Sequence, residues 1–129
     1  MDAKKLESIP LFEKLSRKDR EKVARWADEV DVPTGYRLLD QGRLPHEFFL
    51  VEEGTVEVTK DGAHLTNLGP GDFFGEIAIL EHDRRTASVV ASTPVTAIVM
   101  LARDFESMAA ELPEVAEQIH AAIRERMGR

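Results

Sequence analysis

The residues between positions 74 and 89 combine the side chains of this sequence that have the clearest chemical use. Gly75-Glu76 stands at the start of a short apolar segment that has the character of a helical turn, and Arg85-Thr86 precedes a β-like run. Free backbone N–H groups and a fork-shaped guanidinium both bind phosphate, and a carboxylate accepts a hydrogen bond from a ribose hydroxyl. One loop therefore holds the groups that an anionic sugar phosphate needs.

The Gly75-Glu76 pair has a simpler explanation as well. Gly75 lets the backbone approach a ligand closely or adopt an unusual dihedral angle. Glu76 at the start of a helix would be favoured by the helix dipole without any ligand. The dipole does not explain an arginine ten residues after Gly75, so we favour the ligand-binding interpretation.

The two adjacent arginines are expected to have different roles. Neighbouring residues of a strand point to opposite faces, so one arginine can face a pocket while the other is solvated. Two solvated surface arginines are the simpler alternative. The family resemblance described below assigns Arg85 to the phosphate, and Arg84 to solvent or to a salt bridge with Glu81 or Asp83.

Arg126 is the third basic residue of interest. On a helix it falls within the apolar stripe that Val115, Ile119 and Ile123 define, and an arginine in such a stripe needs a reason. Its guanidinium reaches solvent at the helix end, or it stacks on an aromatic ligand ring. The residues alone leave both alternatives open.

Periodicity and turn residues predict the elements that position these groups. Ser16 followed by Asp19 indicates a capped helix start, and apolar residues at helical spacing predict a helix to about residue 29. Residues 9–15 form a short turn that packs on the same core. Short apolar runs between turn residues then indicate a jelly roll or barrel. The predicted strands cover residues 36–39, 48–51, 55–59, 64–68, 87–91 and 95–101.

The sequence returns to a helical pattern after residue 101. One helix starts at residues 103–105, and Pro113 suits the first turn of a second helix. We therefore expect a single domain over residues 1–129. It consists of a helical N-terminal segment (about 1–29), a β-roll (about 30–101) and C-terminal helices (about 102–127).

Composition excludes several classes of function. The 129 residues suffice for one domain, and 43% hydrophobic with 32% charged residues is typical of a soluble protein. No apolar run approaches the roughly 20 residues of a membrane helix, and the N-terminus lacks a secretory signal, so we expect a cytoplasmic protein. A net charge of −7 repels nucleic acid, but a small anion needs only one well-placed arginine.

Catalytic signatures are missing as well, and we expect no enzyme. The absence of cysteine excludes disulfides, thiolate catalysis and cysteine-ligated metals. The sequence has no Gly-x-Ser-x-Gly nucleophile motif. The histidines are scattered, which argues against a metal site and against a jelly-roll metalloenzyme; they are His46, His64, His82 and His120.

The stretch 74–89 closely resembles the phosphate-binding cassette of cyclic nucleotide-binding domains. The resemblance extends from about Ile9 to Arg126, and it is strongest to bacterial members, including the regulatory domain of a cyclic nucleotide-gated potassium channel. It implies a mainly β fold with flanking α-helices, an eight-stranded double-stranded β-helix or jelly roll. Further matching segments are Pro10-Leu11-Phe12, 49–58, 68–76 and 113–117.

The resemblance also implies roles for individual residues. Glu76 would accept the ribose 2′-hydroxyl, and the backbone N–H groups of Ile77 and Ala78 would meet the cyclic phosphate. Arg85 would pair with the phosphate charge, and Thr86 would supply a backbone N–H and a hydroxyl. The positions that wall the base are Val58, Leu65 and Leu68, and Arg126 matches the tail arginine that caps the base in channel-like members.

The resemblance predicts a signal-transduction module that binds a cyclic nucleotide and moves its flanking helices. Arg84 departs from the proline of many members, and Thr86 is compatible with either nucleotide; we favour cAMP over cGMP. A protein effector is expected, but the sequence does not identify it. The alternative is a divergent domain that serves as a protein-interaction scaffold without nucleotide; the presence of both Glu76 and Arg85 argues against it.

Overall fold

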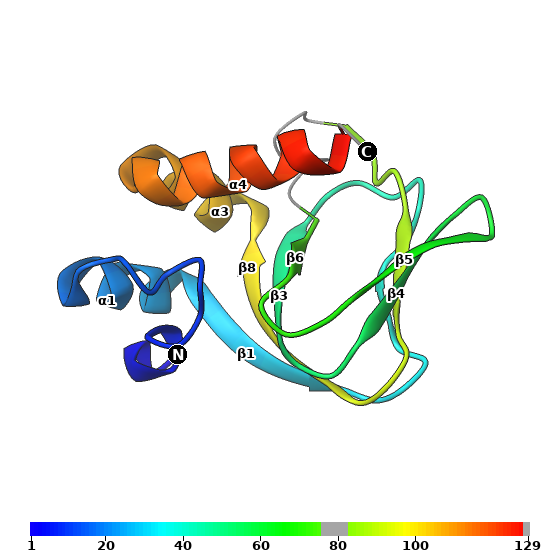
Figure 1. Cartoon of the computed structure of the whole chain (residues 1–129), viewed down its shortest axis with the longest axis horizontal. Coiled ribbons are helices and arrows are strands. Elements are labelled where there is room, and N and C mark those ends of the chain that lie inside the picture. The colour runs from blue at the N-terminus through cyan, green and yellow to red at the C-terminus, as the bar shows by residue number, and fades with distance from the viewer. Residues whose placement is uncertain (76–82, 128–129) are drawn as a thin grey trace.

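The computed structural model describes residues 1–75 and 83–127, except for the side chains of 122–124 and 126–127. It contains two four-stranded antiparallel sheets, with the strand orders β1-β8-β3-β6 and β2-β7-β4-β5. The sheets face each other as a β-roll, and the helices lie together beside the first sheet (Figure 1).

The elements in chain order are η1 (Ala3–Leu6), α1 (Arg17–Trp26), β1 (Ala27–Val32), β2 (Arg37–Leu39), β3 (Glu47–Glu53), β4 (Val56–Lys60), β5 (Ala63–Leu68), β6 (Phe73–Phe74), β7 (Ser88–Ala91), β8 (Val95–Leu101), α3 (Ala102–Glu111) and α4 (Pro113–Met127). This is the expected mainly β fold with flanking helices.

Strand β3 separates two apolar clusters and contributes to both. The helix-side cluster includes Phe48 and Phe105, and the cluster inside the roll includes Phe49 and Phe74. Successive side chains of a strand point to opposite faces, so Phe48 lies on the helix side and Phe49 inside the roll. Phe48 stacks on Phe105 of α3 with ring centroids 4.7 Å apart, and Phe49 stacks on Phe74 of β6 at 5.2 Å. One face of β3 therefore packs against the helices, and the other face packs against the interior of the roll.

Helix α1 begins as predicted but ends earlier than predicted. The Ser16 hydroxyl accepts a hydrogen bond of 3.1 Å from the Asp19 N–H, which confirms the N-cap. The helix ends at Trp26, and the prediction that it continues to about residue 29 is wrong. Residues 27–32 form β1 instead, which pairs with β8 along its whole length. Sheet pairing with a distant strand outweighs the local helical periodicity.

The predicted strands correspond to β2, β3, β4, β5, β7 and β8, with ends shifted by up to two residues. Strand β6 was not predicted, because two residues are too short to show a period of two; it pairs with Phe49 and Leu50 of β3. Pro113 is the first residue of α4, as expected. Val115 and Ile119 of the predicted stripe are buried in the helix-side cluster.

A salt bridge from Lys5 joins the N-terminal segment to a pair of carboxyl groups in the first sheet. The Lys5 ammonium lies 2.7 Å from Oε1 of Glu29 on β1, and Glu29 interacts with Glu52 on β3. Burial, followed by the hydrogen bond and the repulsion from Glu29, raises the pKa of Glu52 to about 7. The hydrogen bond from Lys5 lowers the pKa of Glu29. Two neighbouring carboxyl groups thus titrate in opposite directions from their ordinary values.

The raised pKa of Glu52 predicts that stability falls with rising pH. Between the ordinary glutamate value of 4.5 and about 7, the folded state binds more protons than the unfolded state, so its free energy of unfolding decreases as pH increases. We expect Glu52→Gln to remove this component and to be more stable than wild type at pH 8. The lowered pKa of Glu29 acts below that window, where stability is lost as pH falls.

Urea denaturation at pH 5 and pH 8 measures the effect, with Glu13→Gln as the control at an exposed glutamate of the N-terminal segment. An equal change between the two pH values in wild type and Glu52→Gln would contradict the assignment.

Candidate functional site

The Arg85 side chain is buried, with 6% of the residue exposed, although it lies in a loop. Its Nη1 donates a hydrogen bond of 2.6 Å to the Gly75 carbonyl, and its Nη2 donates to the Glu47 carbonyl at the start of β3. The guanidinium therefore joins the residue that directly follows β6 to the first residue of β3. It also connects Gly75, near the start of the predicted phosphate-binding segment, with Arg85, near the end of that segment.

Gly75 is required at its position for two reasons. Its φ of +93° lies in the left-handed region, which favours glycine. A Cβ at this position would lie 2.9 Å from the Glu47 carbonyl oxygen and 3.0 Å from Nη1 of Arg85. The contact with the arginine is thus possible only because residue 75 has no side chain.

Backbone hydrogen bonds hold Arg85 from the loop between β2 and β3. The Arg85 N–H donates to the Arg43 carbonyl at 2.7 Å, and the Gly42 N–H donates to the Arg85 carbonyl at 2.9 Å. Arg84 is exposed, which agrees with the predicted solvation, and its Nη1 donates to the Gly42 carbonyl at 3.0 Å. The Asp83 carboxylate accepts from the backbone N–H of Arg84 at 2.7 Å. The Arg85 backbone is fixed independently of its side chain.

Several predicted site residues lie outside the described part of the chain. These are Glu76, Ile77 and Ala78, together with Glu81, the suggested salt-bridge partner. Arg126 lies on α4, but its side chain is also outside the description. Thr86 is exposed next to Arg85. Among the predicted residues for the phosphate, the structure therefore brings together Gly75, Arg85 and Thr86.

The predicted base-wall residues lie on the β4–β5 hairpin. Val58 and Leu68 are half-buried and pack against the cluster inside the roll. Leu65 is 56% exposed. Val58 pairs with Thr66 while Thr59 pairs with His64, so Leu65 is an extra residue in the ladder. The hairpin therefore offers an exposed apolar side chain next to the half-buried ones.

Sequence reasoning missed the groups that hold Arg85. These groups are backbone atoms: the carbonyls of Glu47 and Arg43 and the N–H of Gly42. Any residue type could supply the two carbonyls. Only Gly42, with a φ of +86°, left a signal in the sequence, and that signal indicated a turn.

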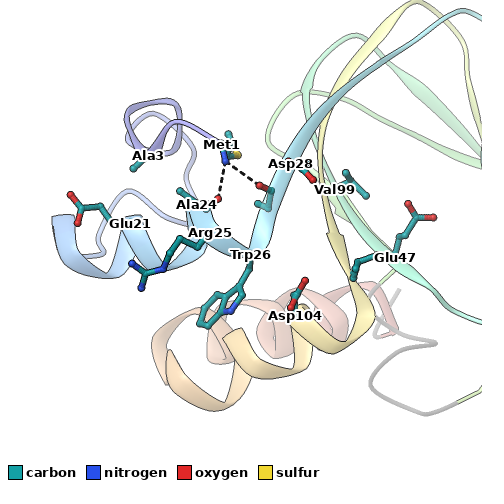
Figure 2. A pocket seen from close by; sticks show the side chains of 12 residues that line it. Met1, Ala3, Glu21, Ala24, Arg25, Trp26, Asp28, Glu47, Val99 and Asp104 are labelled. Atoms are coloured by element: carbon teal, nitrogen blue, oxygen red, sulfur yellow. Dashed lines mark hydrogen bonds between the residues drawn. The ribbon is translucent and has the colours of Figure 1, made fainter.

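A groove of about 930 Å³ lies elsewhere, between α1, β1 and the start of α3 (Figure 2). Trp26, Asp28 and Asp104 line it, and the Met1 amino group donates to the Ala24 carbonyl at 2.9 Å beside it. None of the described residues predicted to bind ligand lines this groove. It shares only Glu47 with the surroundings of Arg85.

Within 1–75 and 83–127, no three acidic or histidine side chains are grouped so that they could hold a metal ion. No helix in those same ranges is both long enough and apolar enough to cross a membrane.

Comparisons with known proteins agree on one family. The family model described as the cyclic nucleotide-binding domain matches residues 29–111. A cyclic nucleotide-gated potassium channel of Rhizobium etli is 35% identical over 121 residues, which cover 94% of this chain and 34% of the channel. A cAMP-dependent protein kinase regulatory subunit of Aspergillus fumigatus is 37% identical over 101 residues, which cover 77% of this chain and 24% of the subunit.

A solved structure shows the same fold. The regulatory domain of Toxoplasma gondii PKA, solved with cAMP, has a TM-score of 0.84 at 23% identity, and the match covers 95% of this chain and 48% of that one. The chain spans about a third of the length of the channel relative and about a quarter of the kinase relative.

The close approach at Gly75 predicts a larger loss of stability for Gly75→Ala than for Gly35→Ala. Both glycines have a positive φ, but a Cβ at Gly35 would meet nothing within 4 Å. We expect the backbone strain alone to cost about 1 kcal/mol at position 35. At position 75 the displaced carbonyl and guanidinium should raise the cost to roughly 2–3 kcal/mol. Urea denaturation of both variants measures the difference, and equal losses would refute the close contact.

Proposed function

The chain belongs to the cyclic nucleotide-binding domain family, and we propose that it is a regulatory module that binds cAMP in preference to cGMP. It carries out no catalysis of its own in this proposal. The observation that carries the proposal is the position of Arg85. Its guanidinium is buried beside Gly75, at the foot of the segment that the family resemblance assigns to the phosphate.

The chemistry of this position suits an anion. Arginine stays protonated at any physiological pH, so the buried guanidinium always carries its charge. Gly75 and Glu47 hold it through neutral carbonyl oxygens, which fix its direction. A fixed guanidinium loses little conformational freedom when it binds, and it recognises phosphate through two parallel hydrogen bonds.

The remaining roles follow the family resemblance. Glu76 accepts the ribose 2′-hydroxyl, and the N–H groups of Ile77 and Ala78 bind the phosphate oxygens. Thr86 adds a hydroxyl from its exposed position next to Arg85. Val58, Leu65 and Leu68 contact the base from the β4–β5 hairpin, and Arg126 covers it from α4.

The preference for cAMP rests on a relative, and one residue of the site is compatible with it. The regulatory subunit from Aspergillus fumigatus is named as cAMP-dependent, and the match to it includes most of this chain. Thr86 is compatible with cAMP in bacterial members of the family, and a bacterial channel is among the relatives of this chain. The cAMP-dependent relative therefore supports the preference, and Thr86 is consistent with it without excluding cGMP.

The output is a shift of the C-terminal helices. Helix α3 packs on α4 and on α1, and Val115 and Ile119 of α4 are buried in the helix-side cluster. A nucleotide that contacts Arg126 on α4 and Arg85 in the roll favours the arrangement in which both contacts form. The equilibrium can shift only by the difference in affinity between the two arrangements. A protein effector that senses α4 completes the pathway.

The proposal predicts binding of cAMP at micromolar concentration or tighter, and weaker binding of cGMP. Arg85→Lys keeps the charge but loses the fork, so we expect the Kd for cAMP to rise by about tenfold or more. Isothermal titration of nucleotide-free protein measures both constants, with Arg103→Lys on α3 as the matched control at an exposed position. Folded wild-type protein that binds neither nucleotide would refute the proposal and favour the scaffold alternative.

The role of Glu76 predicts a specific dependence on the ribose hydroxyl. A hydrogen bond to a charged group contributes about 1.5–3 kcal/mol, so wild type should bind 2′-deoxy-cAMP at least about tenfold more weakly than cAMP. Glu76→Ala should bind both ligands with similar affinity. The same titration tests this, and a variant that still distinguishes the two ligands as strongly as wild type would exclude Glu76 as the acceptor.

A further inference from the structure

Gln41, in the loop after β2, forms two hydrogen bonds with the tip of the β4–β5 hairpin. Its Nε2 donates to Oδ1 of Asp61 at 2.8 Å, and the Asp61 backbone N–H donates to Oε1 of Gln41 at 2.9 Å. One amide side chain is thus both donor and acceptor to a single residue. We call this pair of bonds the Gln41–Asp61 clamp.

The hairpin tip has a conformation that the clamp can hold. Asp61 has a φ of +53° and Gly62 a φ of +80°, as in the two-residue turns typical of hairpins. Asp61 is the non-glycine residue with positive φ in the described part of the chain. The clamp binds both its carboxylate and its N–H, so it fixes the turn in position as well as in orientation.

Strand β5 needs such support because it lies at the edge of its sheet. Among the described strands it pairs only with β4, in the order β2-β7-β4-β5, and Leu65 interrupts that ladder as an extra residue. The pairing of β4 with β7 extends to Thr59 and does not reach the tip. The clamp therefore acts on the part of the hairpin between Leu65 and the turn that the sheet holds least.

The backbone at Gln41 and the two residues after it connects the clamp to Arg85. The Gln41 N–H donates to the hydroxyl of Ser88 on β7 at 3.0 Å. The next two residues, Gly42 and Arg43, exchange backbone hydrogen bonds with Arg85. Residues 41–43 thus run as a strap from the hairpin tip to the backbone of the buried arginine.

We propose that Gln41 is a positioning residue that sets the β4–β5 hairpin at a defined place relative to Arg85, and thereby determines affinity for the base of the nucleotide. The inference rests on the proposed function, because it concerns the same site. Arg85 meets the phosphate, and Leu65 on the hairpin meets the base. The strap fixes the separation between these two contacts.

The clamp requires an amide, and this makes it testable. A glutamine side chain offers a donor and an acceptor, whereas a glutamate at neutral pH offers acceptors only. Gln41→Glu would keep the bond from the Asp61 N–H but place two carboxylates against each other. Asp61→Asn in that background would restore a donor facing the new carboxylate, and asparagine tolerates positive φ.

The experiment is a double-mutant cycle on cAMP affinity by isothermal titration. We expect Gln41→Glu to raise the Kd for cAMP by about fivefold, Asp61→Asn to change it by less than about twofold, and the double variant to return to within about twofold of wild type. Gln118→Glu on α4 is the matched control, with the same change of charge away from the hairpin.

A second ligand separates positioning of the base from general damage. Ribose 3′,5′-cyclic phosphate lacks the base, and its Kd, measured by competition, should change by less than about twofold in Gln41→Glu. Unchanged cAMP affinity in Gln41→Glu, no recovery in the double variant, or equal losses for both ligands would each overturn the proposal. Wild-type protein that binds no cAMP would instead show that the proposed function itself is wrong, and the positioning role would fall with it.

Discussion

The buried guanidinium of Arg85 is the interaction on which the arrangement of the site depends. It links the Gly75 carbonyl, after β6, to the Glu47 carbonyl, at the start of β3, and it reaches them from the loop before β7. Two of these elements belong to one sheet and the third belongs to the other. Burying a charge is costly unless hydrogen bonds satisfy it, so the three segments must stay in place around it. A glycine at position 75 is the local condition for this contact.

Strand β3 explains how the site is related to the helices. Glu47, its first residue, contacts Arg85 through its carbonyl, and the next residue, Phe48, stacks on Phe105 of α3. The His46 carbonyl accepts from the N–H of Ala102, the first residue of α3, at 2.8 Å. Consecutive residues of one chain segment thus hold the arginine on one side and a helix on the other. A closely packed interior has few voids, so a displacement of Glu47 would be passed on to α3 through Phe48.

The sequence predicted much of the fold, because the relevant signals are local. Alternation and turn residues located β2–β5, β7 and β8, and Ser16 marked the start of α1. It failed at β1 and β6, whose pairing with distant strands leaves no local pattern. At the site, Gly75 and Arg85 were each predicted to bind the ligand, and that role stays a prediction; the hydrogen bond between them is a finding of the structure that the sequence did not predict. The supporting Glu47 carbonyl and the strap at 41–43 were not predicted either, because backbone donors and acceptors are common to all residue types.

The position of the site between the two sheets has a consequence for regulation. Val58, Leu65 and Leu68 belong to the sheet β2-β7-β4-β5, whereas the carbonyls that hold Arg85 lie beside the sheet β1-β8-β3-β6. The helices pack on the second of these sheets through Phe48. The affinity of a ligand that contacts both the hairpin and Arg85 depends on the distance between the two sheets, and it is highest at one distance. Because α3 follows β8 without a linker, the helix shift that we propose would follow directly from a change in that separation. The roll therefore needs no separate transmission element between the proposed nucleotide site and α4.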